Sequence, residues 1–135
     1  MNKLALAAAE LNRKSDELNA IIDDFEEALE NANVGVGVLL EKPLATETLK
    51  LASANISSFL GYAKINGRWR LCVTRALLDE CGKIIKMEEP APLQNAPRLV
   101  RLEAVRVFDD LATALSLKMT QYSEAIRAAT VKRRA

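Results

Sequence analysis

The sequence predicts an α+β fold in which two long antiparallel helices, one near each end of the chain, flank a central antiparallel β meander of three to five strands. Apolar residues recur at alternating steps of three and four over residues 1–33 and again over 97–130, which is the period of a helix with one buried side. Over residues 34–89 the period changes to two, as in half-buried strands. Within that stretch, an Asn-Gly pair between two alternating runs predicts a β hairpin over residues 59–75.

The first helix is expected over residues 1–33. Its apolar stripe consists of nine residues: Leu4, Ala8, Leu11, Ser15, Leu18, Ile22, Phe25, Leu29 and Ala32. A helix of about 30 residues is roughly 45 Å long, which is longer than the core of a small domain needs. We therefore expect it to lie along another long element, in the same chain or in a second copy. Asn31–Asn33 and the following Gly35 are suited to ending it.

The segment after this helix is expected to be a strand that shares one apolar face: Val34, Val36, Val38 and Leu40. Gly35 and Gly37 leave the other face bare, which suggests that another backbone approaches closely. Pro43 should end the strand. Residues 46–52 fit either a strand or a helical turn, and residues 55–58 are expected to form a turn.

The hairpin prediction rests on Asn66-Gly67, because both central residues of a type I′ turn have positive φ. A two-residue loop fixes the register, so Ile65 pairs with Arg68 and the pairs continue to Leu60 with Val73. The core face then holds Leu60, Tyr62, Trp69, Leu71 and Val73. The opposite face is half polar and is expected to face water near the turn; it holds Phe59, Gly61, Ala63, Arg68, Arg70, Cys72 and Thr74.

The rest of the chain is expected to complete the meander and form the second helix. Residues 76–78 should extend the second hairpin strand, and residues 83–87 should add another. The proline-rich stretch 90–97 is interpreted as an extended linker, and Pro97 suits the first turn of a helix. The stripe of that second helix is Val100, Ala104, Phe108, Leu111, Leu115, Met119, Tyr122, Ile126 and Ala129. The basic tail 131–135 is expected to fray.

Charge predicts how the helices are oriented. Three acidic residues lie near the end of the first helix, where the helix dipole favours cations: Glu26, Glu27 and Glu30. Three basic residues lie near the start of the second helix, where it favours anions: Arg98, Arg101 and Arg106. Antiparallel packing would bring the two groups together. Exposed ion pairs are worth only about 0–1 kcal/mol each, so charge would select the orientation while apolar burial stabilises it.

Composition excludes several classes of function. The 135 residues are expected to form a single domain, and a formal net charge of +1 gives no general attraction to nucleic acid or membranes. Histidine, the commonest general base and metal ligand, does not occur in the sequence. Cys72 and Cys81 have no metal or redox spacing and are expected to be free thiols. No export signal or membrane-spanning run is recognised, so a cytoplasmic protein is expected.

The candidate site residues are few, and no catalytic, cofactor-binding or metal-binding residue is predicted. A possible interaction surface consists of Arg68, Arg70, Arg98, Arg101 and Arg106. Tyr62 and Trp69 are candidates for lining a pocket, with the core as their alternative location. The acidic run that contains Glu26 is expected to be a solvated helix face, because consecutive helical residues point about 100° apart.

The leading hypothesis is a non-enzymatic interaction or scaffold protein, expected to form a homo-oligomer, most simply a dimer, and to bind an unidentified protein. The alternatives are a nucleic-acid-associated accessory protein using the arginine rows, and a small-molecule or peptide binder between hairpin and helices. The order of elements resembles the layout of prefoldin subunits, in which two long helices flank β hairpins. That resemblance rests on element order alone and implies a chaperone-like or assembly role.

Overall fold

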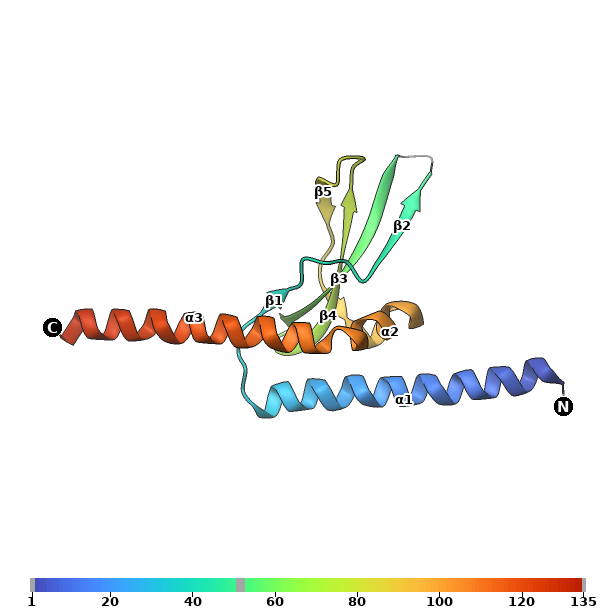
Figure 1. The fold of residues 1–135 in the computed structure, drawn as a ribbon, viewed down its shortest axis with the longest axis horizontal. Helices are drawn as coiled ribbons and strands as arrows, with labels where there is room; N and C mark the ends of the chain where they lie inside the picture. Colours follow the sequence, from blue (N-terminus) through green and yellow to red (C-terminus); the bar gives the residue numbers. More distant parts are fainter. Residues whose placement is uncertain (1, 51–52, 135) are drawn as a thin grey trace.

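The computed structural model describes residues 2–50 and 53–134 of the chain. It has an α+β fold, in which three helices lie across one end of a curled antiparallel sheet (Figure 1). The helices are α1 (Lys3–Asn31), α2 (Arg98–Arg106) and α3 (Phe108–Arg134). The strands are β1 (Val38–Leu39), β2 (Ala45–Leu49), β3 (Ala54–Ile65), β4 (Arg68–Leu78), β5 (Ile84–Met87) and β6 (Ala91–Pro92).

The hairpin of β3 and β4 is the centre of the sheet, and its predicted register is confirmed. Ile65 pairs with Arg68 across Asn66-Gly67, and the ladder continues without a shift to Asn55 opposite Leu78. Both turn residues have positive φ, 51° at Asn66 and 81° at Gly67, as a type I′ turn requires. β1 and β2 pair with the outer edge of β3, while β5 and β6 pair with the outer edge of β4.

The helices cover the face of the hairpin that the alternation predicted as the core face. Leu60, Tyr62 and Leu71 are almost completely buried there. One hydrophobic cluster joins this face to all three helices; it contains Ile22, Leu29, Val34, Leu60, Tyr62, Leu71, Val73, Leu93, Val100, Ala104, Phe108, Leu111 and Leu115. The opposite face is more covered than expected, since Cys72 and Thr74 are also buried.

The segments beside the hairpin differ from the predictions in detail. The strand expected over 34–40 is reduced to Val38–Leu39, but the predicted close approach occurs at Gly37, where an added Cβ would lie 2.7 Å from the Tyr62 carbonyl oxygen. Of residues 46–52, those up to Leu49 belong to β2, and Leu51 and Ala52 lie outside the described residues. The turn expected at 55–58 is wrong: these residues continue β3, held between β2 and β4.

The stretch 90–97 is not an extended linker. Its first part pairs with β4, with Pro92 opposite Cys72. Its next part is a single 3-10 turn, η1 (Leu93–Asn95), and the Leu93 side chain is completely buried. Because this segment is fixed against the sheet and α1, it determines where the last helices start.

The predicted second long helix is divided at Val107, which has φ −115° and ψ 17°, outside helical geometry. α2 ends there, and α3 begins with Asp109 and Asp110 in its first turn, where acidic residues are favourable. α3 continues to Arg134, so the described part of the tail 131–135 is helical rather than frayed, and Ala135 lies outside the described residues.

The prediction that the two long helices pack antiparallel is wrong. Arg101 of α2 bonds to Asn19 of α1, and the rings of Phe108 and Phe25 lie 4.4 Å apart, so residue numbers rise together along both sides of the contact. α1 and α3 therefore run in the same direction (Figure 1). The reason is the fixed segment 90–97, which starts α2 beside the middle of α1, at Asn19, rather than at its end.

Candidate functional site

The arginines predicted as an interaction surface lie on two elements: Arg68 and Arg70 on β4, and Arg98, Arg101 and Arg106 on α2. On the hairpin, Arg68 lies 3.4 Å from the Glu30 carboxylate, and Arg70 Nε lies 3.4 Å from Glu26 Oε1. The acidic end of α1 is thus neutralised by β4 and not by the second helix. Arg70 also donates a hydrogen bond of 3.2 Å to Gln94 Oε1.

Two of the three α2 arginines, Arg101 and Arg106, have hydrogen-bond partners within this chain. Arg101 donates to the Ala96 carbonyl oxygen at 3.1 Å and to the Asn19 side chain, while Arg106 donates to Glu103 Oε1 at 2.8 Å. Three of the five predicted arginines are therefore paired with glutamates of this chain. This pairing lowers the positive charge that the set offers to a phosphate backbone.

Glu26 is a buried carboxylate, although its acidic run predicted a solvated helix face. It is only 6% exposed, and its Oε2 accepts a hydrogen bond of 2.9 Å from the Leu71 backbone N–H on the outer edge of β4. The sequence does contain a signal for this burial: Glu26 lies four residues after Ile22 and three before Leu29, on the same side of the helix as the apolar stripe. Glu26 therefore joins α1 to the hairpin by a charge-assisted hydrogen bond.

Tyr62 and Trp69 lie together, as their common face predicted, with stacked rings 5.6 Å apart. Tyr62 is 1% exposed and belongs to the core, whereas Trp69 is half-buried beside it. Burial, and then the negative charges of Glu26 and Glu30, raise the pKa of Tyr62 above its ordinary value of 10.0. The two rings border an open cavity of about 200 Å³ next to the hairpin turn.

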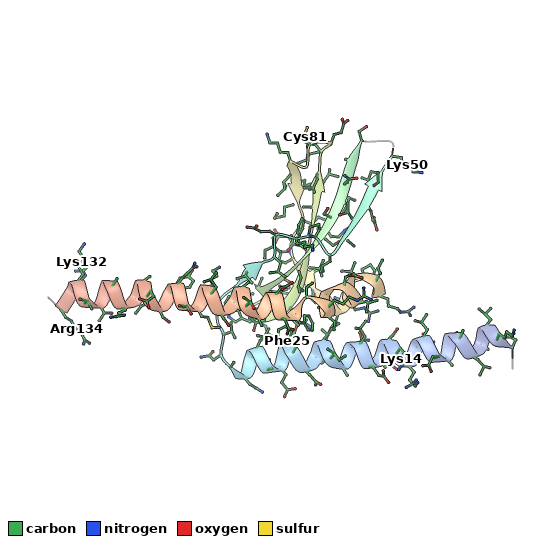
Figure 2. All side chains as sticks on the ribbon, viewed as in Figure 1. Lys14, Phe25, Lys50, Cys81, Lys132 and Arg134 are labelled. Atoms are coloured by element: carbon green, nitrogen blue, oxygen red, sulfur yellow. The ribbon has the colours of Figure 1, made fainter. Side chains whose placement is uncertain are left out.

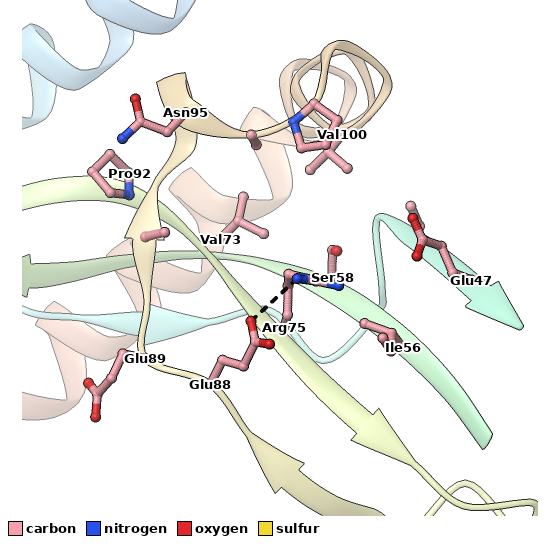
Figure 3. A pocket seen from close by; sticks show the side chains of 14 residues that line it. Glu47, Ile56, Ser58, Val73, Arg75, Glu88, Glu89, Pro92, Asn95 and Val100 are labelled. Carbon is pink, nitrogen blue, oxygen red and sulfur yellow. Dashed lines mark ion pairs between the residues drawn. The ribbon is translucent and has the colours of Figure 1, made fainter. Parts of the chain in front are cut away.

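A larger cavity of about 360 Å³ lies between the sheet and the start of α2 (Figure 3). Val73, Pro92 and Val100 form its apolar side, and an Arg75–Glu88 ion pair of 3.6 Å crosses its other side. Its remaining carboxylates, Glu47 and Glu89, are exposed. The cavity thus combines an apolar wall with an acidic rim.

The outer face of the sheet carries an exposed apolar surface. Leu39, Ile84 and Met87 are 41–51% exposed there and border a depression of about 420 Å³ together with Phe59 and Leu78. These residues come from four different strands. The predictions for the outer face of the hairpin named Phe59 alone among them.

The two long helices extend beyond the core at opposite ends of the molecule, as Figure 2 shows at Lys14 and Lys132. We call residues 3–17 of α1 and 120–134 of α3 the free ends. Apart from half-buried Ser15, every residue of both free ends is exposed. They nevertheless carry large apolar side chains: Leu4, Leu6, Leu11, Tyr122, Ile126 and Val131. Burial in the core accounts for only part of each apolar stripe.

The two cysteines lie in different environments. Cys81 is exposed at the tip of the sheet, far from the helices (Figure 2), while Cys72 is 1% exposed within β4. Burial, and then the charge of Glu26, raise the pKa of the Cys72 thiol from 9.0 to about 11. The neutral thiol is thus the form that the folded chain favours.

The raised pKa of Cys72 predicts a loss of stability in alkaline solution. Below pH 9 the thiol is protonated in both folded and unfolded chains, so its contribution is constant. From pH 9 to about 11 the unfolded chain loses the proton first, and we expect the free energy of unfolding to fall by about 1–2 kcal/mol. Urea denaturation across this range should show a smaller fall for Cys72→Ala, and parallel curves would contradict the prediction.

Comparisons of the chain with models of protein families, with curated proteins and with solved structures find no match in any of the three. The resemblance to prefoldin in element order therefore gains no support. Among the helices of residues 2–50 and 53–134, none is both long and apolar enough to cross a membrane. Within the same residues, no cluster of three or more acidic or cysteine side chains is arranged to hold a metal ion.

Proposed function

We propose that this chain is a non-enzymatic scaffold or assembly protein that self-associates through the free ends of its two long helices. The observation that carries the proposal is that the apolar stripe of each long helix extends well beyond the part of that helix that the core buries. α1 buries only its last part, with Ile22, Glu26 and Leu29 buried, and α3 only its first part, with Phe108, Leu111 and Leu115 buried.

Isolated helical segments of this length are marginal in water without tertiary packing. Each free end contains 15 residues and is about 22 Å long. Exposed apolar residues at helical spacing are typical of surfaces that bind another helix. A contact that covers Leu11 and Ile126 would both stabilise the free ends and hide their apolar side chains.

Solution mass by light scattering across a dilution series tests this proposal. We expect an oligomer that Leu11→Asp and Ile126→Asp each dissociate, because a charge at the centre of an apolar contact must be desolvated. Both side chains are exposed in the single subunit, at 47% and 64%, so the variants should still fold. Circular dichroism would confirm that they do.

The matched controls are Leu6→Asp and Leu117→Asp. These leucines are also exposed, at 57% and 60%, but lie two residues away from the stripe positions Leu4 and Leu115. They should leave the solution mass unchanged. A monomer at every concentration, or equal dissociation by the control variants, would contradict the proposal.

The alternatives have weaker support. Nucleic-acid binding through the arginines is disfavoured by the pairing of Arg68, Arg70 and Arg106 with glutamates. A small-molecule or peptide ligand would have to use the 360 Å³ cavity, whose acidic rim would suit a cationic group. The exposed outer face of the sheet offers a surface for a further protein partner. A cytoplasmic location belongs to the same proposal, since both cysteines are free.

A further inference from the structure

We infer that the two kinds of free end bind each other between two copies of the chain: the free end of α1 packs antiparallel against the free end of α3 of a second copy, in a two-fold dimer. This inference rests on the proposed function and names the partner of the same surfaces. The directions, the apolar spacing, the charges and the described lengths of the two free ends all agree with this pairing.

The directions follow from the fold. α1 and α3 run the same way, and their free ends point to opposite ends of the molecule (Figure 1). A two-fold axis perpendicular to the helices reverses the second copy. It therefore places the second copy's α3 free end on the same side as the first copy's α1 free end, and antiparallel to it. The same operation forms both contacts at once, which closes the dimer.

The spacing of the stripes agrees with this arrangement. From Ala8 to Leu18 the stripe of α1 advances by three, four and three residues, and from Ala129 back to Met119 the stripe of α3 does the same. Antiparallel packing then forms four layers: Ala8 with Ala129, Leu11 with Ile126, Ser15 with Tyr122, and Leu18 with Met119. Leu18 and Met119 are half-buried at the edge of each subunit's core, so this layer is where the contact between the two copies would end.

The Ser15–Tyr122 layer would help to fix the register. Within the part of the chain that the structure describes, Ser15 Oγ has no hydrogen-bond partner. Tyr122 is 53% exposed, and its hydroxyl can donate or accept a hydrogen bond. A polar layer between apolar layers favours one register over its neighbours, as in coiled coils.

The charges disfavour the pairing of two α3 free ends. The α3 free end has four basic residues and one acidic residue, whereas the α1 free end has three of each. Two α3 free ends would therefore repel each other, and an α1–α3 pair would not. Beside the apolar layers, Lys14 falls opposite Ala125 and Lys132 opposite Ala7, so each long cation lies against a small side chain.

The equal length of the free ends completes the argument. Each has 15 residues, from the helix terminus to the point where burial in the core begins. Within the described residues, the two free ends therefore overlap along their whole length in the antiparallel pair. The dimer would contain two such contacts, each about 22 Å long, related by the two-fold axis.

Disulfide trapping of mixed variants tests the pairing. Leu11→Cys and Ile126→Cys are made in separate chains, each with Cys81→Ser because Cys81 is exposed. After subunit exchange and mild oxidation, the mixture should form a cross-linked dimer on a non-reducing gel, and neither variant alone should do so. Ala8→Cys with Ala129→Cys is a second pair in the same register, so that one unfavourable disulfide geometry does not decide the result.

Leu6→Cys mixed with Leu117→Cys is the control, because both side chains are exposed but lie off the stripes. Cross-linking of Leu11→Cys or Ile126→Cys with itself would overturn the inference in favour of like free ends. An oligomer by light scattering in which neither designed pair cross-links would overturn it as well and leave the proposed function standing. A monomer by light scattering would refute both.

Discussion

Replacing Glu26 with alanine should lower the free energy of unfolding by about 2–4 kcal/mol. The carboxylate is buried, accepts the Leu71 backbone N–H at 2.9 Å and lies 3.4 Å from Arg70 Nε. Without it, the buried N–H has no acceptor, and Arg70, whose side chain is 24% exposed, loses its counter-charge. Urea denaturation followed by circular dichroism measures the change.

Two variants make this test specific. Glu26→Gln keeps an acceptor oxygen but no charge, so it should lose less stability than Glu26→Ala. Glu27→Ala removes an exposed carboxylate from the same turn of α1 and should change the free energy of unfolding by no more than about 0.5 kcal/mol. Equal effects of the Glu26→Ala and Glu27→Ala variants would show that Glu26 does not join α1 to β4.

Replacing Leu93 with alanine should cost about 2–5 kcal/mol, the usual range for truncating a buried leucine. Leu93 is completely buried, and its 3-10 turn lies against both β4 and α1. The truncation leaves a cavity where the sheet, α1 and the segment that leads into α2 meet. The free energy of unfolding from urea denaturation would report this loss.

Leu99→Ala is the matched control for Leu93. Leu99 lies six residues further along and is 62% exposed, so its truncation should change stability by less than about 0.5 kcal/mol. If the Leu93→Ala variant were as stable as the Leu99→Ala variant, then residues 90–97 would act as a passive linker, and the direction of the last helices would need another cause.

The hairpin and the existence of the long helices could be predicted because their signals are local. A two-residue Asn-Gly loop fixes the register of every pair beyond it, so Tyr62 and Trp69 could be placed on one face from the turn alone. Helical periodicity likewise identifies the stripes. For these elements the determining interactions lie within a few residues along the chain or follow from the register of one turn.

Polar residues gave wrong predictions where tertiary contacts outweigh local preference. Ser57 suggested a turn, yet it is 1% exposed within β3 and shares a hydrogen bond of 2.9 Å with Thr46 of β2. Glu26 suggested a solvated face, yet it is buried against the hairpin. In both cases the side chain finds a hydrogen-bond partner in a neighbouring element, and that partner removes the cost of burial.

The sequence by itself determined the α+β class, the hairpin register and the length of the apolar stripes. Only the tertiary structure decided the direction of the last helices, because the pairing of Pro92 with Cys72 and the burial of Leu93 fix where α2 begins. It also decided which part of each stripe the subunit covers. A periodic pattern records that a helix face is apolar, but the positions of the other elements determine how much of that face is removed from water.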